Sequence, residues 1–246
     1  MPLLRPLAVM LVLLLSIHAR AGGSDLLASA TPLTGLTSDT GSNLAATAED
    51  GEPTHGIGGP AASVWWRWTA VSNGLYSITT LDSTFDTVLG VYTGSTVDAL
   101  TWIAGNDDSP GEDSTSRVML DASPGISYAI AVDGYDGETG AISLRVEAAP
   151  NTRMEGTVRD RNGNPLANIE VVAWKQVLLP DGERWDRTAS LDTRPDGSYA
   201  LLGLPAGTYT LYFFDSARNY AGQFLGGVQE RHEAGLQLIQ LATGVP

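Results

Sequence analysis

The sequence predicts an all-β protein built from two β-sandwiches in tandem. Short β-rich runs recur along the chain with Gly, Asp, Asn and Pro between them, and no segment carries a long apolar stripe at helical spacing. Alternation supports strands: Ile126, Tyr128, Ile130 and Val132 share one face, and the residues between them take the other. Strands at this spacing are typical of sandwiches.

The first 21 residues have the order of a secretory signal peptide. Arg5 supplies a positive start, residues 7–17 form an apolar run, and Ala19 and Ala21 are small residues around a cleavable bond. The run is too short and wrongly flanked for a membrane span. We therefore expect cleavage after Ala21 and a product without a membrane span, secreted to the periplasm or the medium.

The 225 residues that then remain of the 246 suit two domains. Residues 22–32 are rich in small and polar side chains, which predicts a flexible segment. A proline at position 150 stops strand pairing, so we expect one sandwich over 33–149 and a second over 150–246. The expected strands are 63–70, 74–80, 86–93, 100–104, 116–121, 127–133 and 141–147, then 153–159, 169–176, 185–191, 198–202, 208–214 and 236–241.

Charge is distributed unevenly over the two halves. Between positions 24 and 150 there are 17 acidic residues and three arginines, a net charge of −14, whereas from 151 onward the net charge is −2. Such a surface repels phosphate backbones, which argues against nucleic acid and anionic membranes as partners. There is no cysteine, so disulfides cannot stabilise the chain. The acidity fits either a bound hard cation or solubility alone.

Five motifs of the first half occur in one order: EDGEPTH at 49–55, SVWWRWT at 63–69, FDTVLGVYTG at 85–94, NDD at 106–108 and YAIAVDG at 128–134. Together they resemble the bacterial pre-peptidase C-terminal domain family over about residues 33–147. The resemblance implies a jelly-roll-like sandwich. Some members of that family bind calcium, and some bind extracellular matrix protein.

One loop gathers oxygen-bearing side chains. Within eight residues around a Pro-Gly pair it holds Asn106, Asp107, Asp108, Glu112 and Asp113. Calcium takes six to eight oxygen ligands and tolerates irregular loops, so these five residues are the candidate calcium ligands. The spacing is not that of an EF-hand. The alternative is a turn in which Asn and Asp bond their own backbone.

The tryptophan-rich strand has two different faces. Val64, Trp66 and Trp68 point one way and are expected in the core. Trp65 points the other way with Arg67, which makes it a candidate for an exposed ligand contact. The alternative is that Trp65 packs beneath the N-terminal segment.

The second half carries a further set of motifs: GTVRDRNGNPLA at 156–167, DGSYAL at 196–201 and LPAGTYTL at 204–211. They resemble the carboxypeptidase regulatory-like family, a transthyretin-like sandwich, over about residues 153–241. Asn162-Gly163 and Asp196-Gly197 fit tight turns that need positive φ. Tyr209, Leu211 and Phe213 are expected to face the sheet interior.

That family implies an accessory module, and its fold is grouped with carbohydrate-binding sandwiches. By this analogy Trp174, Trp185, Tyr212 and Tyr220 are candidate sugar contacts, although aromatic side chains in small sandwiches also serve as core or edge packing.

The sequence holds no recognisable catalytic set. After signal removal only His55 and His232 remain, without a His-Glu-x-x-His or Gly-x-Ser-x-Gly motif. We therefore expect a secreted, non-catalytic binding or accessory protein that contacts extracellular protein or polysaccharide. The alternatives are a structural envelope or matrix component without a small ligand, and a hydrolase with an unrecognised site.

Overall fold

The computed structural model describes residues 22–56, 59–109, 114–229 and 236–242. Within them the helical structure is limited to short 3-10 turns, η1 (Leu27–Ser29), η2 (Val97–Ala99) and η3 (Tyr135–Gly137), and the rest of the ordered backbone is β. The all-β prediction is confirmed. None of the described residues forms a helix that is long and apolar enough to cross a bilayer. The expected signal peptide, residues 1–21, lies outside the described part.

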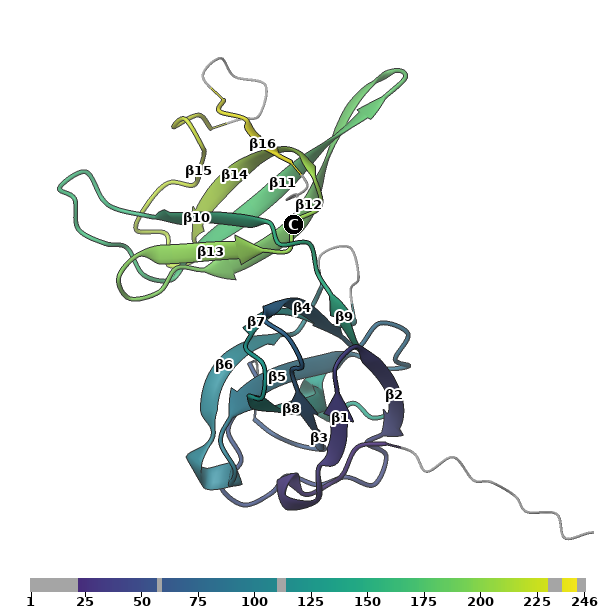
Figure 1. Ribbon diagram of the computed structural model, residues 1–246. Helices are drawn as coiled ribbons and strands as arrows, with labels where there is room; N and C mark the ends of the chain where they lie inside the picture. Colours follow the sequence, from purple (N-terminus) through teal and green to yellow (C-terminus); the bar gives the residue numbers. More distant parts are fainter. Residues whose placement is uncertain (1–21, 57–58, 110–113, 230–235, 243–246) are drawn as a thin grey trace, which may run out of the picture.

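The first half is a sandwich of two sheets (Figure 1). A five-stranded sheet has the order β1-β3-β8-β5-β6, and a four-stranded sheet has the order β2-β9-β4-β7. The strands are β1 (Thr31–Thr34), β2 (Thr37–Ser42), β3 (Val64–Thr69), β4 (Gly74–Thr79), β5 (Thr87–Thr93), β6 (Thr101–Asn106), β7 (Arg117–Ala122), β8 (Ser127–Gly134) and β9 (Ala141–Ala148).

The main core lies between these two sheets. Trp66 and Trp68 of β3 are fully buried there, together with Ile130 of β8, and the opposite sheet contributes Ile78 and Leu144. The two indole N–H groups still find acceptors, Asp39 Oδ2 at 2.8 Å for Trp66 and the Gly35 carbonyl at 2.8 Å for Trp68. The prediction that these two tryptophans form core is confirmed.

The N-terminal segment covers the other face of β3. Ser24 and Trp65 exchange two backbone hydrogen bonds of 3.1 and 2.8 Å, and Leu27 of η1 is only 2% exposed. Leu27 and Trp65 join Tyr92 in a second cluster of buried residues. Residues 22–32 are therefore tied to the sandwich, and the expectation of a flexible segment is wrong, because burial of Leu27 and strand pairing hold it.

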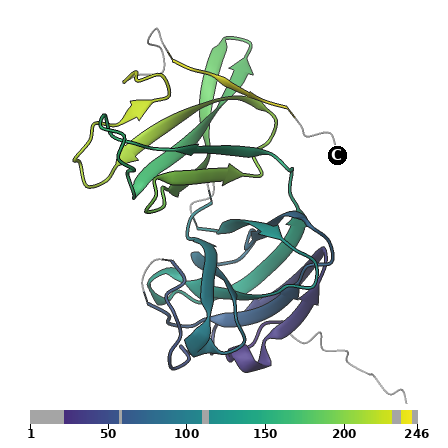
Figure 2. The same ribbon diagram turned by 60° about the vertical axis from the view of Figure 1, so that its left-hand side comes forward.

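The second half is also layered. The sheet β12-β11-β14-β15, with β16 on β14, packs against the pair β10-β13 (Figure 2). Gly163 and Gly197 have φ of 86° and 77°, as the turn residues predict. Tyr209 and Leu211 are buried in its core. The strands are β10 (Arg153–Thr157), β11 (Ile169–Leu179), β12 (Gly182–Asp192), β13 (Ser198–Leu202), β14 (Gly207–Asp215), β15 (Gln223–Phe224) and β16 (Ile239–Leu241).

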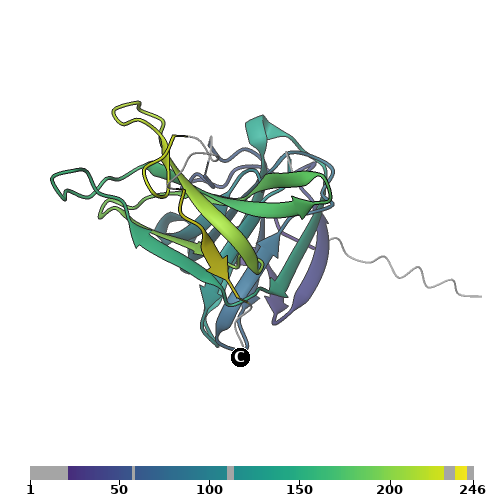
Figure 3. The same ribbon diagram turned by 90° about the horizontal axis from the view of Figure 1, so that it is seen from above.

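In the described residues no sheet combines strands from the two halves. The two halves lie end to end in Figures 1 and 2, and in the view from above the second half lies in front of the first (Figure 3). Arg153 of β10 bonds Asp121 of β7 across the junction at 2.7 Å. Gly203 has a φ of 68° and lies so close to Met119 that a Cβ there would collide with its sulfur. The sheets of the two halves therefore divide between β9 and β10, and Pro150 lies in the stretch that joins these strands.

Candidate functional site

A buried polar network links the loop before β3 to β5. His55 Nε2 lies 2.9 Å from Glu52 Oε1, and His55 Nδ1 lies 2.8 Å from the hydroxyl of Tyr92. Ser63 donates to the same Glu52 oxygen, and the side chains of Glu52 and His55 are 0% and 1% exposed. Burial, and then the charge of Glu52, raises the pKa of Tyr92.

The hydrogen bonds of this network fix where its protons lie. Tyr92 donates its only proton to the Thr54 carbonyl at 2.9 Å, so His55 Nδ1 must carry the proton that bonds Tyr92. His55 Nε2 and Glu52 Oε1 lie within hydrogen-bonding distance, 2.9 Å apart. Glu52 separates Ser63 from His55, so the imidazole cannot take the serine proton, and the set is not arranged as a nucleophilic triad.

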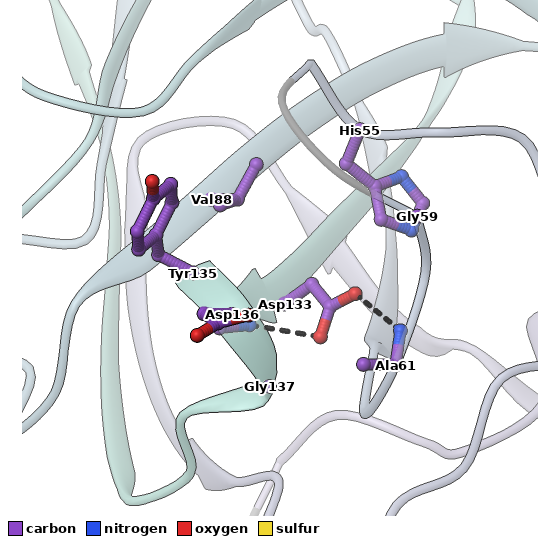
Figure 4. Close-up of a pocket in the computed structure, with 9 residues that line it drawn as sticks. His55, Gly59, Ala61, Val88, Asp133, Tyr135, Asp136 and Gly137 are labelled. Carbon is purple, nitrogen blue, oxygen red and sulfur yellow. Dashed lines mark hydrogen bonds between the residues drawn. The ribbon is translucent and has the colours of Figure 1, made fainter.

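A cavity of about 370 Å³ opens beside this network (Figure 4). Its floor includes the buried side chains of Val88 and Asp133, and its rim includes Tyr135 and Asp136 of η3. His55 and Tyr135 stand on opposite sides of the cavity in Figure 4. The volume lies at the lower end of the range of small-ligand pockets.

Asp133 is held rigidly at the floor of this cavity. It is 3% exposed and accepts hydrogen bonds from the backbone N–H groups of Ala61 at 2.8 Å, Ala62 at 2.9 Å and Gly134 at 2.8 Å. These bonds join the end of β8 to the loop before β3, 71 or 72 residues away in sequence. No ion pair is formed by Asp133 within the described residues.

The predicted calcium loop is only partly described. Asn106 ends β6 and bonds the backbone at both sides, Asp108 O at 3.0 Å and Arg117 N at 2.8 Å. Asp107 and Asp108 follow it, whereas Glu112 and Asp113 lie outside the described residues. In the part of the chain that is described, no group of three or more His, Asp or Glu side chains is arranged to hold a metal.

Two carboxylates near this loop nevertheless have uncompensated oxygens. Asp86 Oδ1 and Asp107 Oδ1 are buried without a hydrogen-bond partner. Burial, and then the charges of Asp108 and Asp86, raises the pKa of Asp107 to about 6. Burial, and then the charges of Asp108 and Glu138, raises the pKa of Asp86. A cation at this position would offset both the burial and the repulsion.

Three of the four candidate sugar contacts of the second half come together on one face of one sheet, whereas Tyr220 lies exposed in the loop between β14 and β15. On β11 Trp174 lies opposite Thr210 of β14, and Tyr212 lies opposite Val172, two residues before Trp174. Trp185 of β12 lies opposite Gln176, two residues after Trp174. Because residues two apart on a strand share a face, all three side chains lie on the outer face of this sheet. Each is half-buried.

The same face carries planar polar side chains between the aromatic rings. Arg187 bonds Glu170 at 2.6 Å, and Gln176 bonds Glu183. Phe214, 38% exposed, stacks on Tyr212 with ring centroids 6.5 Å apart. We call the outer face of Trp174, Trp185, Tyr212 and Phe214 the aromatic face.

Of the two alternatives for Trp65, the structure shows the packing beneath the N-terminal segment and corrects the exposed ligand contact. It is fully buried, with its ring edge-on to His55 at 5.4 Å between centroids, so it cannot contact a ligand at the surface. Trp102 and Tyr135 were not singled out by the sequence, yet they are 46% and 44% exposed. Tyr135 stands in a turn behind the 128–134 motif, and that adjacency is the one signal that points to it.

A second hollow, of about 630 Å³, lies at the junction of the halves. It is lined by β6, β7 and the end of β9 on one side, and by β12, β13 and the loop before β14 on the other. Arg117 and Arg194 are its basic side chains, and Glu147 is one of its acids. Its lining is thus mixed in charge and does not specify one ligand.

No family model and no curated protein matches this chain. Among solved structures, a GH2 β-galacturonidase from Eisenbergiella tayi bound to glycerol is similar at 11% sequence identity and a TM-score of 0.20. The match covers 61% of this chain and 32% of that enzyme's chain. The chain therefore spans about a third of the enzyme, and at this level of likeness nothing of the enzyme's activity transfers to it.

Proposed function

We propose that this chain is a secreted, non-catalytic binding protein whose aromatic face contacts polysaccharide. The observation that carries the proposal is that Trp174, Trp185 and Tyr212, distant in sequence, share one face of a sheet. The C–H faces of sugar rings are apolar, so they pack on aromatic rings, whereas their hydroxyls need polar partners at the ring edge. Glu170, Arg187 and their neighbours supply such partners on the same face.

The test is binding of the mature chain to an array of polysaccharides and extracellular matrix proteins. We expect retention on at least one polysaccharide, reduced about tenfold by Trp174→Ala, which matches the loss of about 1.4 kcal/mol of ring stacking. Trp102→Ala is the matched control, because Trp102 is an exposed tryptophan of the first half. An equal loss in both variants contradicts the proposal, and retention on matrix protein alone assigns the chain to protein partners.

We propose in addition that calcium binds beside Asp86, Asp107 and Asp108. The residues fit a hard cation because two of their buried oxygens lack any partner. Bound calcium would supply charge neutralisation and thereby stabilise the first sandwich. At a hundredfold excess over the dissociation constant, binding to the folded state alone adds about 2.7 kcal/mol.

Thermal melting of the mature chain with calcium and with chelator tests the calcium proposal. We expect a higher melting temperature in calcium, and no such rise in the double variant Asp107→Asn/Asp108→Asn. An unchanged melting temperature, or an equal rise in the double variant, contradicts calcium binding there.

A further inference from the structure

The cavity between β5, β8 and η3 has an acidic lining without any basic partner. Asp133 lies at its floor and Asp136 at its rim, and no Lys or Arg is among the residues that line it. His55 also lines it, but Glu52 compensates any charge on that imidazole. We propose that this cavity binds an organic cation, an ammonium or guanidinium group, either of a small amine or of a lysine or arginine side chain of a partner protein.

The carboxylate of Asp133 is the first argument. A buried charge is costly unless it is paired, and Asp133 is 3% exposed without a cationic partner in the described residues. Three backbone N–H groups hold it in place, one on Oδ2 and two on Oδ1, which leaves acceptor capacity on Oδ2. In Figure 4 this carboxylate stands between Ala61 and η3, at the floor of the cavity.

The rim supplies the second argument. The turn of η3 holds Tyr135 and Asp136 side by side, because Asp136 has a φ of 49° and Gly137 one of 78°. Tyr135 N donates to the Asp86 carbonyl at 2.9 Å, and Glu138 N donates to the Tyr135 carbonyl at 3.0 Å. An exposed aromatic ring next to carboxylates attracts cations through the ring face as well as through charge.

The electrostatic field of the residues around the cavity is negative, like that of the cavity lining. The buried Oδ1 of Asp86 accepts no hydrogen bond, and the backbone N–H of Asp86 donates to Glu138 Oε2 at 3.0 Å. Burial, and then the charge of Asp108, raises the pKa of Asp86, so a further carboxylate lies near Asp86. Carboxylates at the mouth of a cleft focus the field and concentrate cations there.

The geometry favours an organic cation over a metal ion inside the cavity. A calcium ion needs six or more oxygens close together, whereas the carboxylates among the described residues that line this cavity are those of Asp133 and Asp136. An alkylammonium needs only a few acceptors plus apolar wall, and Val88 and the Tyr135 ring provide that wall. A volume of about 370 Å³ accommodates one long side chain or a small amine.

The experiment is an NMR titration of the ¹⁵N-labelled mature chain with n-butylammonium, with n-butanol as the neutral probe. We expect shifts at the amides of Asp133 to Gly137 with butylammonium and none with butanol. Asp136→Asn and Tyr135→Ala should each weaken binding about fivefold, as expected for an exposed charge pair or a cation–π contact. Asp192→Asn, an exposed carboxylate of the second sandwich, is the matched control and should change nothing.

A second ligand distinguishes a free amine from a side chain of a partner protein. Nα-acetyl-lysine methylamide binding more tightly than butylammonium assigns the site to a partner's side chain, and equal binding assigns it to a free amine. Two outcomes overturn the proposal. One is chemical-shift changes scattered over all acidic residues. The other is binding that survives Asp136→Asn and Tyr135→Ala but is lost in Asp107→Asn/Asp108→Asn. The site does not depend on the aromatic face, so Trp174→Ala should leave this titration unchanged.

Discussion

At the residue scale, Trp65 connects the N-terminal segment to the polar network of the first sandwich. Its ring packs against His55 and Tyr92 with centroids 5.4 and 6.0 Å away, and its indole N–H is buried without an acceptor. The network behind it is closed to solvent at Glu52, His55 and Ser63. The packing of the Trp65 ring and the hydrogen bonds of the buried polar network therefore depend on one another.

We expect Trp65→Ala to destabilise the first sandwich by about 3–5 kcal/mol, since it removes a large fully buried ring. Trp65→Phe should cost less, because it keeps an aromatic ring and removes an unpaired buried donor. Urea unfolding followed by circular dichroism measures both. A loss below about 1 kcal/mol in Trp65→Ala would show that the cluster with Leu27 collapses around the gap.

The raised pKa of Asp107 predicts a pH dependence with a definite sign. The folded state holds its proton up to about pH 6, whereas the free carboxyl has a pKa of 3.8. Protonation of Asp107 therefore stabilises the fold fully below pH 3.8, and this contribution is lost as the pH rises to about 6. In chelator, Asp107→Asn should be more stable than the wild type above pH 6, and this advantage should shrink as the pH falls toward 4.

Unfolding curves of the wild type and Asp107→Asn at several pH values measure this difference. Asp192→Asn serves as the control because it is exposed and lies in the other sandwich. A stability difference that is constant with pH would contradict the raised pKa.

At the element scale, the buried strands were predictable and several edge strands were not. In the runs 127–133 and 198–202 the large apolar side chains recur at every second position, so β8 and β13 are predicted by this periodicity. The strands β1 and β2 stand at sheet edges and bury few side chains, so their Thr- and Ser-rich sequence gives no apolar signal. β15 is two residues long in a glycine-rich stretch.

The candidate sites show the same limit. Alternation placed Trp66 and Trp68 in the core, but the burial of Trp65 depends on a segment some 40 residues earlier in the chain. The cavity could not be predicted from the sequence, because it forms where Asp133 bonds the loop at Ala61, and these two residues lie 72 positions apart in the chain. The shared face of Trp174, Trp185 and Tyr212 required the register of three strands.

Removal of residues 22–30 tests the role of the N-terminal segment. This change strips Leu27 and the Ser24 backbone bonds from β3, so we expect a lower melting temperature and a red shift of tryptophan fluorescence from exposed Trp65. Replacing residues 216–219, an exposed turn of the second half, by a Gly-Ser turn is a control that leaves the cover of β3 in place. An unchanged spectrum would show that the segment does not cover Trp65.

At the scale of the whole molecule, the two halves have separate cores. The junction holds the solvent-exposed Arg153–Asp121 ion pair, of a kind that contributes little to stability, and the contact of Gly203 with Met119. We therefore expect fragments 22–149 and 150–246 to fold separately, each with a cooperative transition near that of its half in the intact chain. Calorimetry of the three proteins measures this, and a fragment without a transition would contradict independent folding.

The backbone pairing of Ser24 with Trp65 also has a consequence for digestion of the chain from its amino end. If the leader is cleaved after Ala21, only two residues precede this anchor. After such cleavage we expect aminopeptidases to trim the chain slowly, because the contacts that bury Trp65 also hold residue 24 against β3. The sequence contains no cysteine, so no disulfide adds to this protection.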